Sequence, residues 1–290
     1  YFGIKVNLQK HGSKKSFDAL LNKVNGKSIV SSSDFDSDTG RLKNPDSLLL
    51  NKKEVEKLLS EIEKGDWVVN DIKEKPRTSN PKPPFTTSTL QQEAARKLRF
   101  SAKNTMRVAQ QLYENGFITY MRTDSTHLSE EALKGSRNII SKLYGDDFLP
   151  KTANQYTTNV KNAQEAHEAI RPAHKVFLSI EKVSSQLGND AGKLYELIWQ
   201  RTIASQMLPA KLKQTSVIIS NLETEFRASG QIIVFPGYMK IYVEGRDNPD
   251  AELANKEKIL PELSVNEKLN CSKLETQAHK TKPPARFTEA

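Results

Sequence analysis

The 290-residue sequence contains one cysteine, Cys271, and no long run of apolar residues. A single cysteine excludes an internal disulfide and a cysteine-rich zinc site within this chain, and it is typical of proteins of the reducing cytoplasm. No apolar segment approaches the length needed to cross a bilayer, and the N-terminus lacks a signal-peptide layout. The sequence therefore predicts a soluble, cytoplasmic protein without a membrane partner.

Positive charge is in excess. The chain has 44 basic and 35 acidic residues, a net charge of +9 and an isoelectric point near 9.3. This balance suits a polyanionic partner such as nucleic acid, although many proteins carry the same surplus on solvated faces. Residues 84–207 hold sixteen basic and twelve acidic residues, a net +4, and the other +5 lies outside them. Net charge therefore does not locate a binding region.

Strand-like periodicity occupies both ends of the chain. From residue 1 to about residue 30 the pattern is extended, and Phe2, Ile4, Val6 and Leu8 alternate with mostly polar residues. Further strand candidates are residues 67–69, 216–219, 225–228, 231–235, 241–243 and 268–277.

Helical periodicity dominates the middle of the chain. A first helix, over residues 51–64, has a capping box at Asn51 and Glu54, and Ser88 with Gln91 predicts a second box. Later helices are predicted over residues 90–98, 105–114, 129–143, 164–170 and 191–207. The 105–114 helix is expected to have Met106, Ala109, Gln110 and Tyr113 along one side.

Two polar segments separate these elements. Residues 31–40 contain Asp34, Asp36 and Asp38, but Thr39 and Pro45 stand where a calcium loop needs glycine and glutamate, so a solvated loop is expected. Residues 75–84 hold four prolines and predict a stiff connector outside any sheet ladder.

These patterns predict an α+β fold, in which a discontinuous strand-rich domain contains an inserted helical domain. The expected parts are residues 1–80 and 208–280 for the strand-rich domain, 81–207 for the helical domain, and 281–290 for the start of a further domain. The helices near Arg99, Lys103 and Arg107 are compatible with a helix-turn-helix that follows a phosphate backbone. A solvated basic surface explains these charges equally well.

A tyrosine and an arginine two positions apart stand between two predicted helices. In an extended segment Tyr120 and Arg122 project to the same side, so that both can meet one ligand. The pair suits attack on a phosphodiester, with the phenol oxygen as nucleophile and the guanidinium on the non-bridging oxygens. The alternative is that Tyr120 is packed in the core, as most such tyrosines are.

Three longer strings carry a family resemblance. Residues 116–126 read Gly-Phe-Ile-Thr-Tyr-Met-Arg-Thr-Asp-Ser-Thr, residues 164–172 read Gln-Glu-Ala-His-Glu-Ala-Ile-Arg-Pro, and residues 281–290 read Thr-Lys-Pro-Pro-Ala-Arg-Phe-Thr-Glu-Ala. In order and spacing they closely resemble segments of the type IA DNA topoisomerases, the bacterial topoisomerase I group. The resemblance is firm from about residue 76 onward and loose before it. Because the chain begins with Tyr1 and ends within the third string, we expect an excerpt of a longer enzyme.

The resemblance implies an activity and its requirements. Such an enzyme relaxes negatively supercoiled DNA by cutting one strand, passing the other and resealing, without ATP. Its implied partners are single-stranded and negatively supercoiled DNA and the remaining domains of the same polypeptide, with an arch-like strand-rich domain, a monomeric state and a location at the bacterial nucleoid. The family also uses Mg²⁺ on an acidic N-terminal domain that has no match here. We therefore expect no metal ligand in this chain, and weak single-strand binding without cleavage from the chain alone.

The matching motif positions imply individual roles. Tyr120 corresponds to the nucleophile that forms a 5′-phosphotyrosyl link, and Arg122 to the group that holds the scissile phosphate. The residues implied to support catalysis are His167, Asp124, Arg171 and Glu168. The residues implied to contact DNA sugar or phosphate are Thr119, Thr123 and Ser125. These three are equally able to cap the next helix, and an ordinary structural hydrogen bond stays open for His167.

Two other classes of protein fit the same residues. A non-catalytic nucleic-acid-binding module would use the basic helices and aromatic side chains to hold single strands. A structural or protein-interaction fragment would show no salt-dependent affinity for DNA.

Overall fold

The computed structural model describes all residues except 14, 37, 157–167, 243–257 and 282–290. Contacts divide the chain into two compact units, each assembled from segments far apart in the sequence. The sheet unit comprises residues 1–77, 213–232 and 257–287, and the helical unit comprises residues 78–212, 233–256 and 288–290. A large sheet and several helices confirm the predicted α+β class. Among the described residues, no helix is long and apolar enough to cross a membrane.

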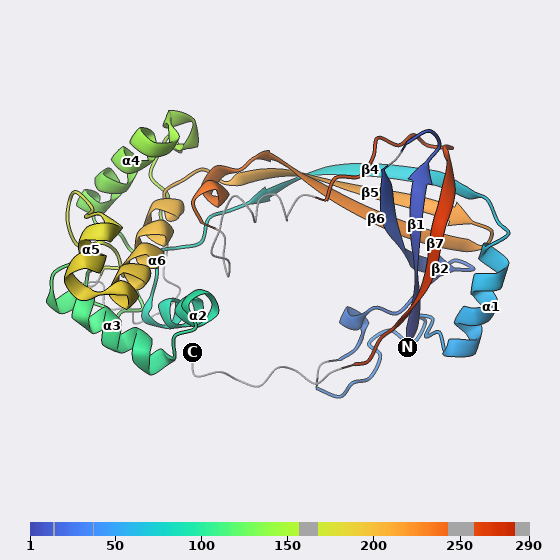
Figure 1. Ribbon diagram of the computed structural model, residues 1–290, viewed down its shortest axis with the longest axis horizontal. Coiled ribbons are helices and arrows are strands. Elements are labelled where there is room, and N and C mark those ends of the chain that lie inside the picture. Colours follow the sequence, from blue (N-terminus) through green and yellow to red (C-terminus); the bar gives the residue numbers. More distant parts are fainter. Residues whose placement is uncertain (14, 37, 157–167, 243–257, 282–290) are drawn as a thin grey trace. The chain divides into compact units, whose positions relative to one another are not determined.

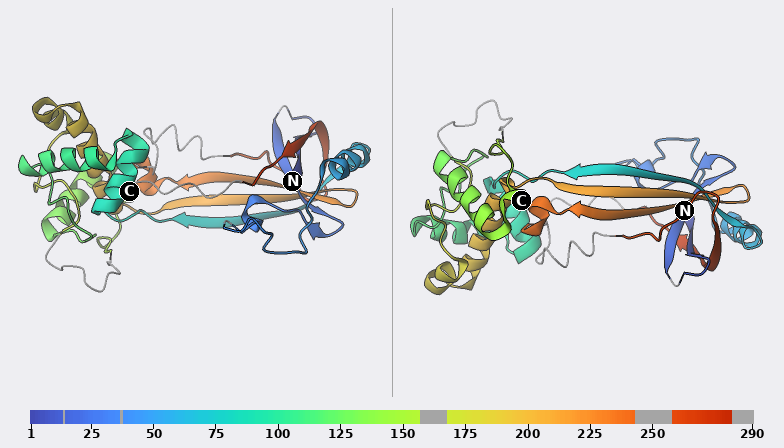
Figure 2. Two further views of the ribbon diagram at one scale, coloured as in Figure 1. Left: turned by 90° about the horizontal axis from the view of Figure 1, so that it is seen from below. Right: turned by 90° about the horizontal axis from the view of Figure 1, so that it is seen from above.

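The sheet has the strand order β1-β7-β4-β5-β6-β2-β3, and an additional β1–β2 pairing closes six of these strands into a ring. Figures 1 and 2 show β4, β5 and β6 as long neighbouring strands. The strands are β1 (Phe2–Lys10), β2 (Ser16–Val24), β3 (Lys27–Ser28), β4 (Trp67–Ser79), β5 (Ala210–Asn221), β6 (Thr224–Phe235) and β7 (Lys268–Ala278). Strand β1 pairs antiparallel with both β2 and β7.

The predicted alternation of β1 fills the core of the sheet unit. Ile4, Val6 and Leu8 are buried, whereas the residues between them are only half-buried. Helix α1 (Lys52–Ile62) begins at the predicted capping box, in which the Glu54 amide donates to Asn51 Oδ1 at 3.1 Å and the Asn51 amide donates to Glu54 Oε2 at 2.8 Å. Its apolar face contributes to the same core.

Three predictions about strands are wrong. Strand β4 passes through Pro76, contrary to the predicted stiff connector, because residues 73–78 are exposed and a missing N–H is tolerated where it would face solvent. Strand β6 continues through Gly230, where a Cβ would lie 2.7 Å from the Lys258 carbonyl oxygen. Glycine there permits close approach of a second segment. Ile241 follows a 3-10 turn instead of starting a strand, and Val243 lies outside the described residues.

The helical unit contains the elements that carry the motif residues. They are α2 (Thr87–Leu98), α3 (Ala102–Glu114), α4 (Glu130–Tyr144), α5 (Ile180–Leu187) and α6 (Asn189–Ser205). Short 3-10 turns are η1 (Ser32–Asp34), η2 (Asp146–Phe148) and η3 (Gly237–Lys240), the first of them in the sheet unit. Helices α2 and α3 are joined by a short turn, and Arg99 ends α2 in the left-handed conformation, with φ of 59°. Ser129 caps α4 and Gly145 ends it, as predicted.

Other helix predictions need correction. Thr86 caps α2 in place of Ser88, since the Thr86 amide donates to Thr89 Oγ1 at 2.9 Å. The described end of the predicted 164–170 helix is not helical, because Ile170 forms a bridge with Phe85. Helix α5 was not predicted, as its eight residues span only two turns.

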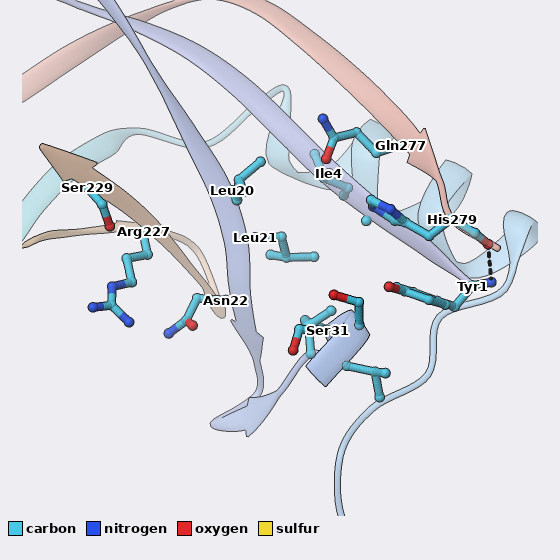
Figure 3. A pocket seen from close by; sticks show the side chains of 14 residues that line it. Tyr1, Ile4, Leu20, Leu21, Asn22, Ser31, Arg227, Ser229, Gln277 and His279 are labelled. Atoms are coloured by element: carbon cyan, nitrogen blue, oxygen red, sulfur yellow. Dashed lines mark hydrogen bonds between the residues drawn. The ribbon is translucent and has the colours of Figure 1, made fainter. Parts of the chain in front are cut away.

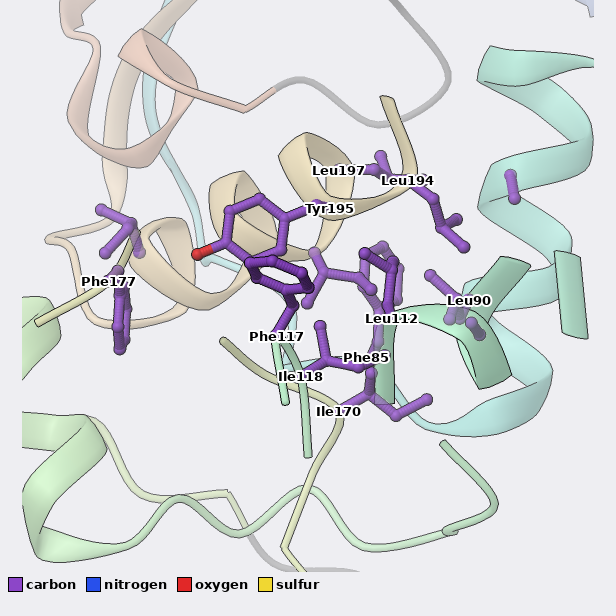
Figure 4. Packing of buried hydrophobic residues seen from close by; sticks show 14 of the residues in the cluster. Phe85, Leu90, Leu112, Phe117, Ile118, Ile170, Phe177, Leu194, Tyr195 and Leu197 are labelled. Carbon is purple, nitrogen blue, oxygen red and sulfur yellow. The ribbon is translucent and has the colours of Figure 1, made fainter. Parts of the chain in front are cut away.

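Apolar side chains from several helices and the connecting segments form one core in the helical unit. Figure 4 shows Phe117 and Tyr195 packed together within it; their ring centroids are 6.4 Å apart. The buried Tyr195 hydroxyl donates to the Leu178 carbonyl at 3.0 Å, so its polar group is satisfied. Ile118 and Ile170 are also fully buried there. This core fixes both segments that flank the motif residues.

Candidate active site

The Tyr120 segment lies between α3 and α4 and has alternating exposure. Gly116, with φ of +73°, follows α3 and lets the chain turn away from the helix. Tyr120 is 39% exposed, and Arg122 and Asp124 are also exposed. The intervening side chains are buried; they are Met121, Thr123 and Ser125. The alternation places the phenol, the guanidinium and the carboxylate on the accessible side of the segment.

One side of this segment is fixed by residues 169–173. The Thr119 amide donates to the Arg171 carbonyl at 2.9 Å, and the Arg171 amide donates to Thr119 Oγ1 at 3.0 Å. The same hydroxyl donates to the Ala169 carbonyl at 2.7 Å. Phe117 accepts a further bond from the Ala173 amide at 2.9 Å. Thr119 therefore uses its hydroxyl to hold the backbone immediately before Tyr120.

The first turn of α2 fixes the other side. Thr87 Oγ1 donates to the Met121 carbonyl at 2.8 Å and accepts from the Thr123 amide at 2.9 Å. Thr123 Oγ1 in turn accepts from the Ser125 amide at 3.0 Å, and Ser125 Oγ accepts from the His127 amide at 3.2 Å. Thr123 and Ser125 therefore brace the backbone of residues 123–127, and they do not cap the next helix, the alternative that the sequence left open, because Ser129 caps α4.

The buried Arg171 and the half-buried Glu168 form an ion pair behind the segment. Arg171 Nη2 donates to Glu168 Oε2 at 2.6 Å and to Ser129 Oγ at 3.2 Å, while Nη1 donates to the Pro172 carbonyl at 2.7 Å. Glu168 Oε1 accepts from the Ser129 amide at 2.7 Å. Burial favours a higher pKa for Glu168, but the hydrogen bonds from Arg171 and Ser129 outweigh it and hold the pKa below its usual range. The pair thus joins the 168–173 segment to the start of α4.

Tyr113 is a neighbour of Tyr120 that the sequence analysis does not single out. It is 42% exposed, and its ring meets the Tyr120 ring at 5.3 Å and 66°. The buried face of α3 consists of Thr105, Val108, Ala109 and Leu112. Centring the helical period on Val108 and Leu112 would have put Tyr113 at the edge of that face.

The predicted basic residues are exposed on and near α3. Lys103 and Arg107 lie one turn apart, and the Arg107 guanidinium donates to Asn104 Oδ1 at 2.8 Å. Arg99 lies in the turn between the helices and is also exposed. From Arg107 to Tyr113 the helix rises about 9 Å.

Some predicted groups are not brought into a cluster. His167 lies outside the described residues, and Asp124 has no described hydrogen-bond or ion-pair partner. Within the described ranges, no group of three histidine, cysteine, aspartate or glutamate residues could hold a metal ion.

Comparisons with known proteins found a matching family model, similar relatives and a similar solved structure. A family model described as DNA topoisomerase matches residues 1–290. The DNA topoisomerase 1 proteins of Synechocystis sp. and Mycolicibacterium smegmatis are 48% and 47% identical over 100% and 96% of this chain, which correspond to 32% and 30% of their own lengths. Full-length topoisomerase I from Thermotoga maritima has a TM-score of 0.67 at 29% identity, over 98% of this chain and 42% of that one.

The matching model spans the entire sequence, and the chain therefore belongs to the DNA topoisomerase family, in its bacterial type IA branch. Its curated relatives are DNA topoisomerase 1 proteins, and the chain spans about a third of their length, 32% in the Synechocystis protein.

The Glu168 ion pair gives a testable dependence of stability on pH. Because folding lowers the Glu168 pKa, its contribution is fully present above the unfolded-state pKa of about 4.3 and is lost as pH falls through the folded-state pKa. Glu168→Gln should lower the free energy of unfolding by about 1–3 kcal/mol at pH 7, and this difference should shrink below pH 4 or so. Urea unfolding at several pH values measures it.

The control for this prediction is Glu131→Gln, an exposed glutamate in the first turn of α4. Its substitution should change stability by less than about 1 kcal/mol, mainly through the helix dipole. A Glu168→Gln deficit that stayed constant down to pH 3 or so would contradict the ion-pair account.

Proposed function

We propose that this chain is the tyrosine-bearing part of an enzyme that relaxes negatively supercoiled DNA by cutting and resealing one strand. The observation that carries the proposal is the accessible Tyr120 phenol, with the Arg122 guanidinium on the same side of a segment held on both flanks. Family membership supplies the reaction class. A buried phenol would have favoured the core alternative.

The proposed cleavage step is a transesterification. The Tyr120 oxygen forms a bond to a backbone phosphorus as the bond from that phosphorus to the 3′ oxygen breaks. The phenol loses one proton and the departing 3′ oxygen gains one, so the products are a 5′-phosphotyrosyl link and a 3′-hydroxyl. One phosphodiester replaces another, and the reverse displacement therefore reseals the strand without ATP.

Arg122 is proposed to hold the scissile phosphate as charge develops on its oxygens. Its guanidinium is exposed, and no described carboxylate is paired with it, so its donors can bind a phosphate. Asp124 is proposed to orient Arg122 from the same side of the segment. Arg171 and Glu168 are proposed to act indirectly by keeping the Tyr120 backbone in place. His167 is proposed to contact the phosphate or to assist proton movement.

The strand to be cut is proposed to approach along the exposed face of α3. Arg99, Lys103 and Arg107 supply positive charge along this route, and Tyr113 supplies an aromatic surface at its end. Thr119, Thr123 and Ser125 are proposed to contact sugar or phosphate after a local rearrangement, because the Thr119 hydroxyl bonds to Ala169 and Arg171 and the other two side chains are buried. The implied substrates are single-stranded and negatively supercoiled DNA.

We further propose that activity needs the rest of the polypeptide. An acidic domain there would bind Mg²⁺, which when bound supplies positive charge near the DNA phosphates. Without that domain the chain should bind single strands weakly and leave supercoiled plasmid unchanged. The enzyme is proposed to act as a monomer in the cytoplasm, at the nucleoid.

Tyr120→Phe tests the nucleophile in the full-length protein. Removing the hydroxyl should abolish the protein-linked 5′ end and relaxation, because the nucleophilic oxygen is lost, while single-strand affinity stays within about twofold. Denaturing gels of labelled oligonucleotides detect the covalent complex. Retained relaxation would support the non-catalytic binding module instead, and Tyr113→Phe is the matched control.

Arg122→Gln tests the phosphate-binding group. Loss of a preorganised charged donor should slow single-turnover cleavage by about 100- to 1000-fold. The loss should appear in the cleavage rate more than in affinity for uncleaved DNA, because the phosphate gains charge in the transition state. Lys134→Gln, on α4, removes the same charge elsewhere and should leave the rate near that of the unmodified protein. Equal effects of both substitutions would contradict a specific role.

Tyr113→Ala tests whether the ring on α3 positions Tyr120. Loss of the edge contact should slow cleavage by about 2- to 10-fold, since an aromatic pair contributes about 0.5–1.5 kcal/mol. Tyr113→Phe keeps the ring and should restore the rate. DNA affinity that fell in parallel with the rate would instead indicate that Tyr113 acts mainly in binding.

A further inference from the structure

Two cavities of similar volume, one in each unit, differ in the groups that they present. The pocket of the sheet unit measures about 540 Å³, and Tyr1, Arg227 and His279 are among the residues that line it. The Tyr1 and His279 rings stack on each other, and Arg227 Nε donates to Ser216 Oγ at 2.9 Å. Figure 3 shows the guanidinium directed away from both rings. The polar groups of this pocket therefore do not converge on one ligand.

The helical unit has a groove of about 560 Å³ between α4 and residues 175–181, and Trp199 of α6 also lines it. We call it the α4 groove. Gly135 lets its two sides meet, because a Cβ at this position would lie 2.8 Å from the Lys175 carbonyl oxygen and 3.6 Å from the Phe177 ring. Any larger residue on this turn of α4 would push the 175–177 segment away from the helix.

The segment that forms one side of the α4 groove is fixed in place. Phe177 is buried in the core of the helical unit, and the Leu178 carbonyl accepts from the Tyr195 hydroxyl at 3.0 Å. Ser179 Oγ accepts from the Lys182 amide at 3.3 Å and caps α5. The groove is therefore already formed in the chain, so a partner that binds there does not have to order this segment first.

Apolar side chains are unusually exposed along the α4 groove. Val176 is 78% exposed, more than any other large apolar side chain among the described residues, and Leu143 is 57% exposed. The half-buried apolar side chains that line the groove with them are Ile139, Leu178, Ile180 and Trp199. An exposed apolar surface that is bordered by polar residues is typical of an interaction site.

Each side of the groove combines an exposed apolar side chain with a lysine. Lys142 precedes Leu143 on α4, and Lys175 precedes Val176 on the facing segment. Neither lysine has a described ion-pair partner, and Glu181 is the single carboxylate among the described residues that line the groove. A complementary surface therefore has apolar groups flanked by carboxylates. A nucleic-acid strand would neutralise the lysines but would not cover the apolar side chains, whereas an acidic amphipathic helix would do both.

We propose that the α4 groove binds an acidic amphipathic helix of a partner protein. The apolar face of that helix lies on Leu143 and Val176, and its carboxylates pair with Lys142 and Lys175. None of the described residues that line the groove belongs to the Tyr120 segment or to the groups proposed to act in cleavage. The proposal therefore stands independently of the proposed reaction.

Fluorescence anisotropy with the full-length protein tests the proposal. The probe is a labelled peptide of about 18 residues, long enough to form a helix, with leucine on one face and glutamate on the other. Its binding should be saturable. The double variant Lys142→Glu/Lys175→Glu should bind it at least about 10-fold more weakly and should gain affinity for the same peptide with lysine in place of glutamate, because opposite charges then meet like charges.

The matched control is Lys134→Glu/Lys151→Glu, which changes the net charge equally at exposed positions of the helical unit outside the groove. Its affinity for the glutamate peptide should stay within about twofold of the unmodified protein. Leu143→Ser and Val176→Ser should each weaken binding by about 5- to 10-fold, since each removes a central apolar contact. Both side chains are exposed, so neither substitution removes a core residue.

Photo-crosslinking of the peptide to the unmodified full-length protein locates the bound helix without any variant. Mass spectrometry should find the crosslinks within residues 138–143 and 175–181. Crosslinks elsewhere, equal losses in the two double variants, or no saturable binding up to about 1 mM would overturn the proposal. Displacement of the peptide by single-stranded oligonucleotide from crosslinked positions in the groove would overturn it in favour of a nucleic-acid site.

Discussion

The pairing of residues 169–173 with three other segments is the constraint on which the candidate site depends. The Ile170 amide bonds to Phe85, the Arg171 carbonyl accepts from Thr119, and the Ala169 amide bonds to His127. The Tyr120 segment has no helix or strand of its own, so these bonds replace the regular structure that would otherwise hold it. Tyr120, the proposed nucleophile, is therefore held in place on an exposed segment.

This arrangement separates the side chains proposed to react from the side chains that hold the segment. The hydroxyl groups of Thr87 and Thr119 donate hydrogen bonds to backbone carbonyls, and the Arg171 guanidinium forms an ion pair with the Glu168 carboxylate. The exposed side of the segment carries Tyr120 and Arg122, and the Arg122 guanidinium can bind an anion. A site built in this way places an accessible guanidinium beside a phenol, while other polar side chains hold the backbone in position.

Local signals explain what the sequence could predict. Helix α4 was located well because Ser129 and Gly145 mark its ends, and β1 because its alternation faces one core. Residues 164–170 were assigned to a helix although the described end pairs with Phe85, a partner more than eighty positions away. Periodicity carries no information about such pairing. The tyrosine and arginine were identified from motif strings, whereas the neighbouring Tyr113 required the true orientation of α3.

The closed ring of strands has a consequence for the behaviour of the sheet unit in solution. An open sheet presents rows of unpaired amides and carbonyls that can recruit a strand from another molecule. The β1–β2 pairing joins strands that would otherwise border a free edge. Ring closure thus protects this unit against edge-to-edge aggregation. This protection matters because the unit is assembled from segments that are far apart in the sequence and are synthesised at different times.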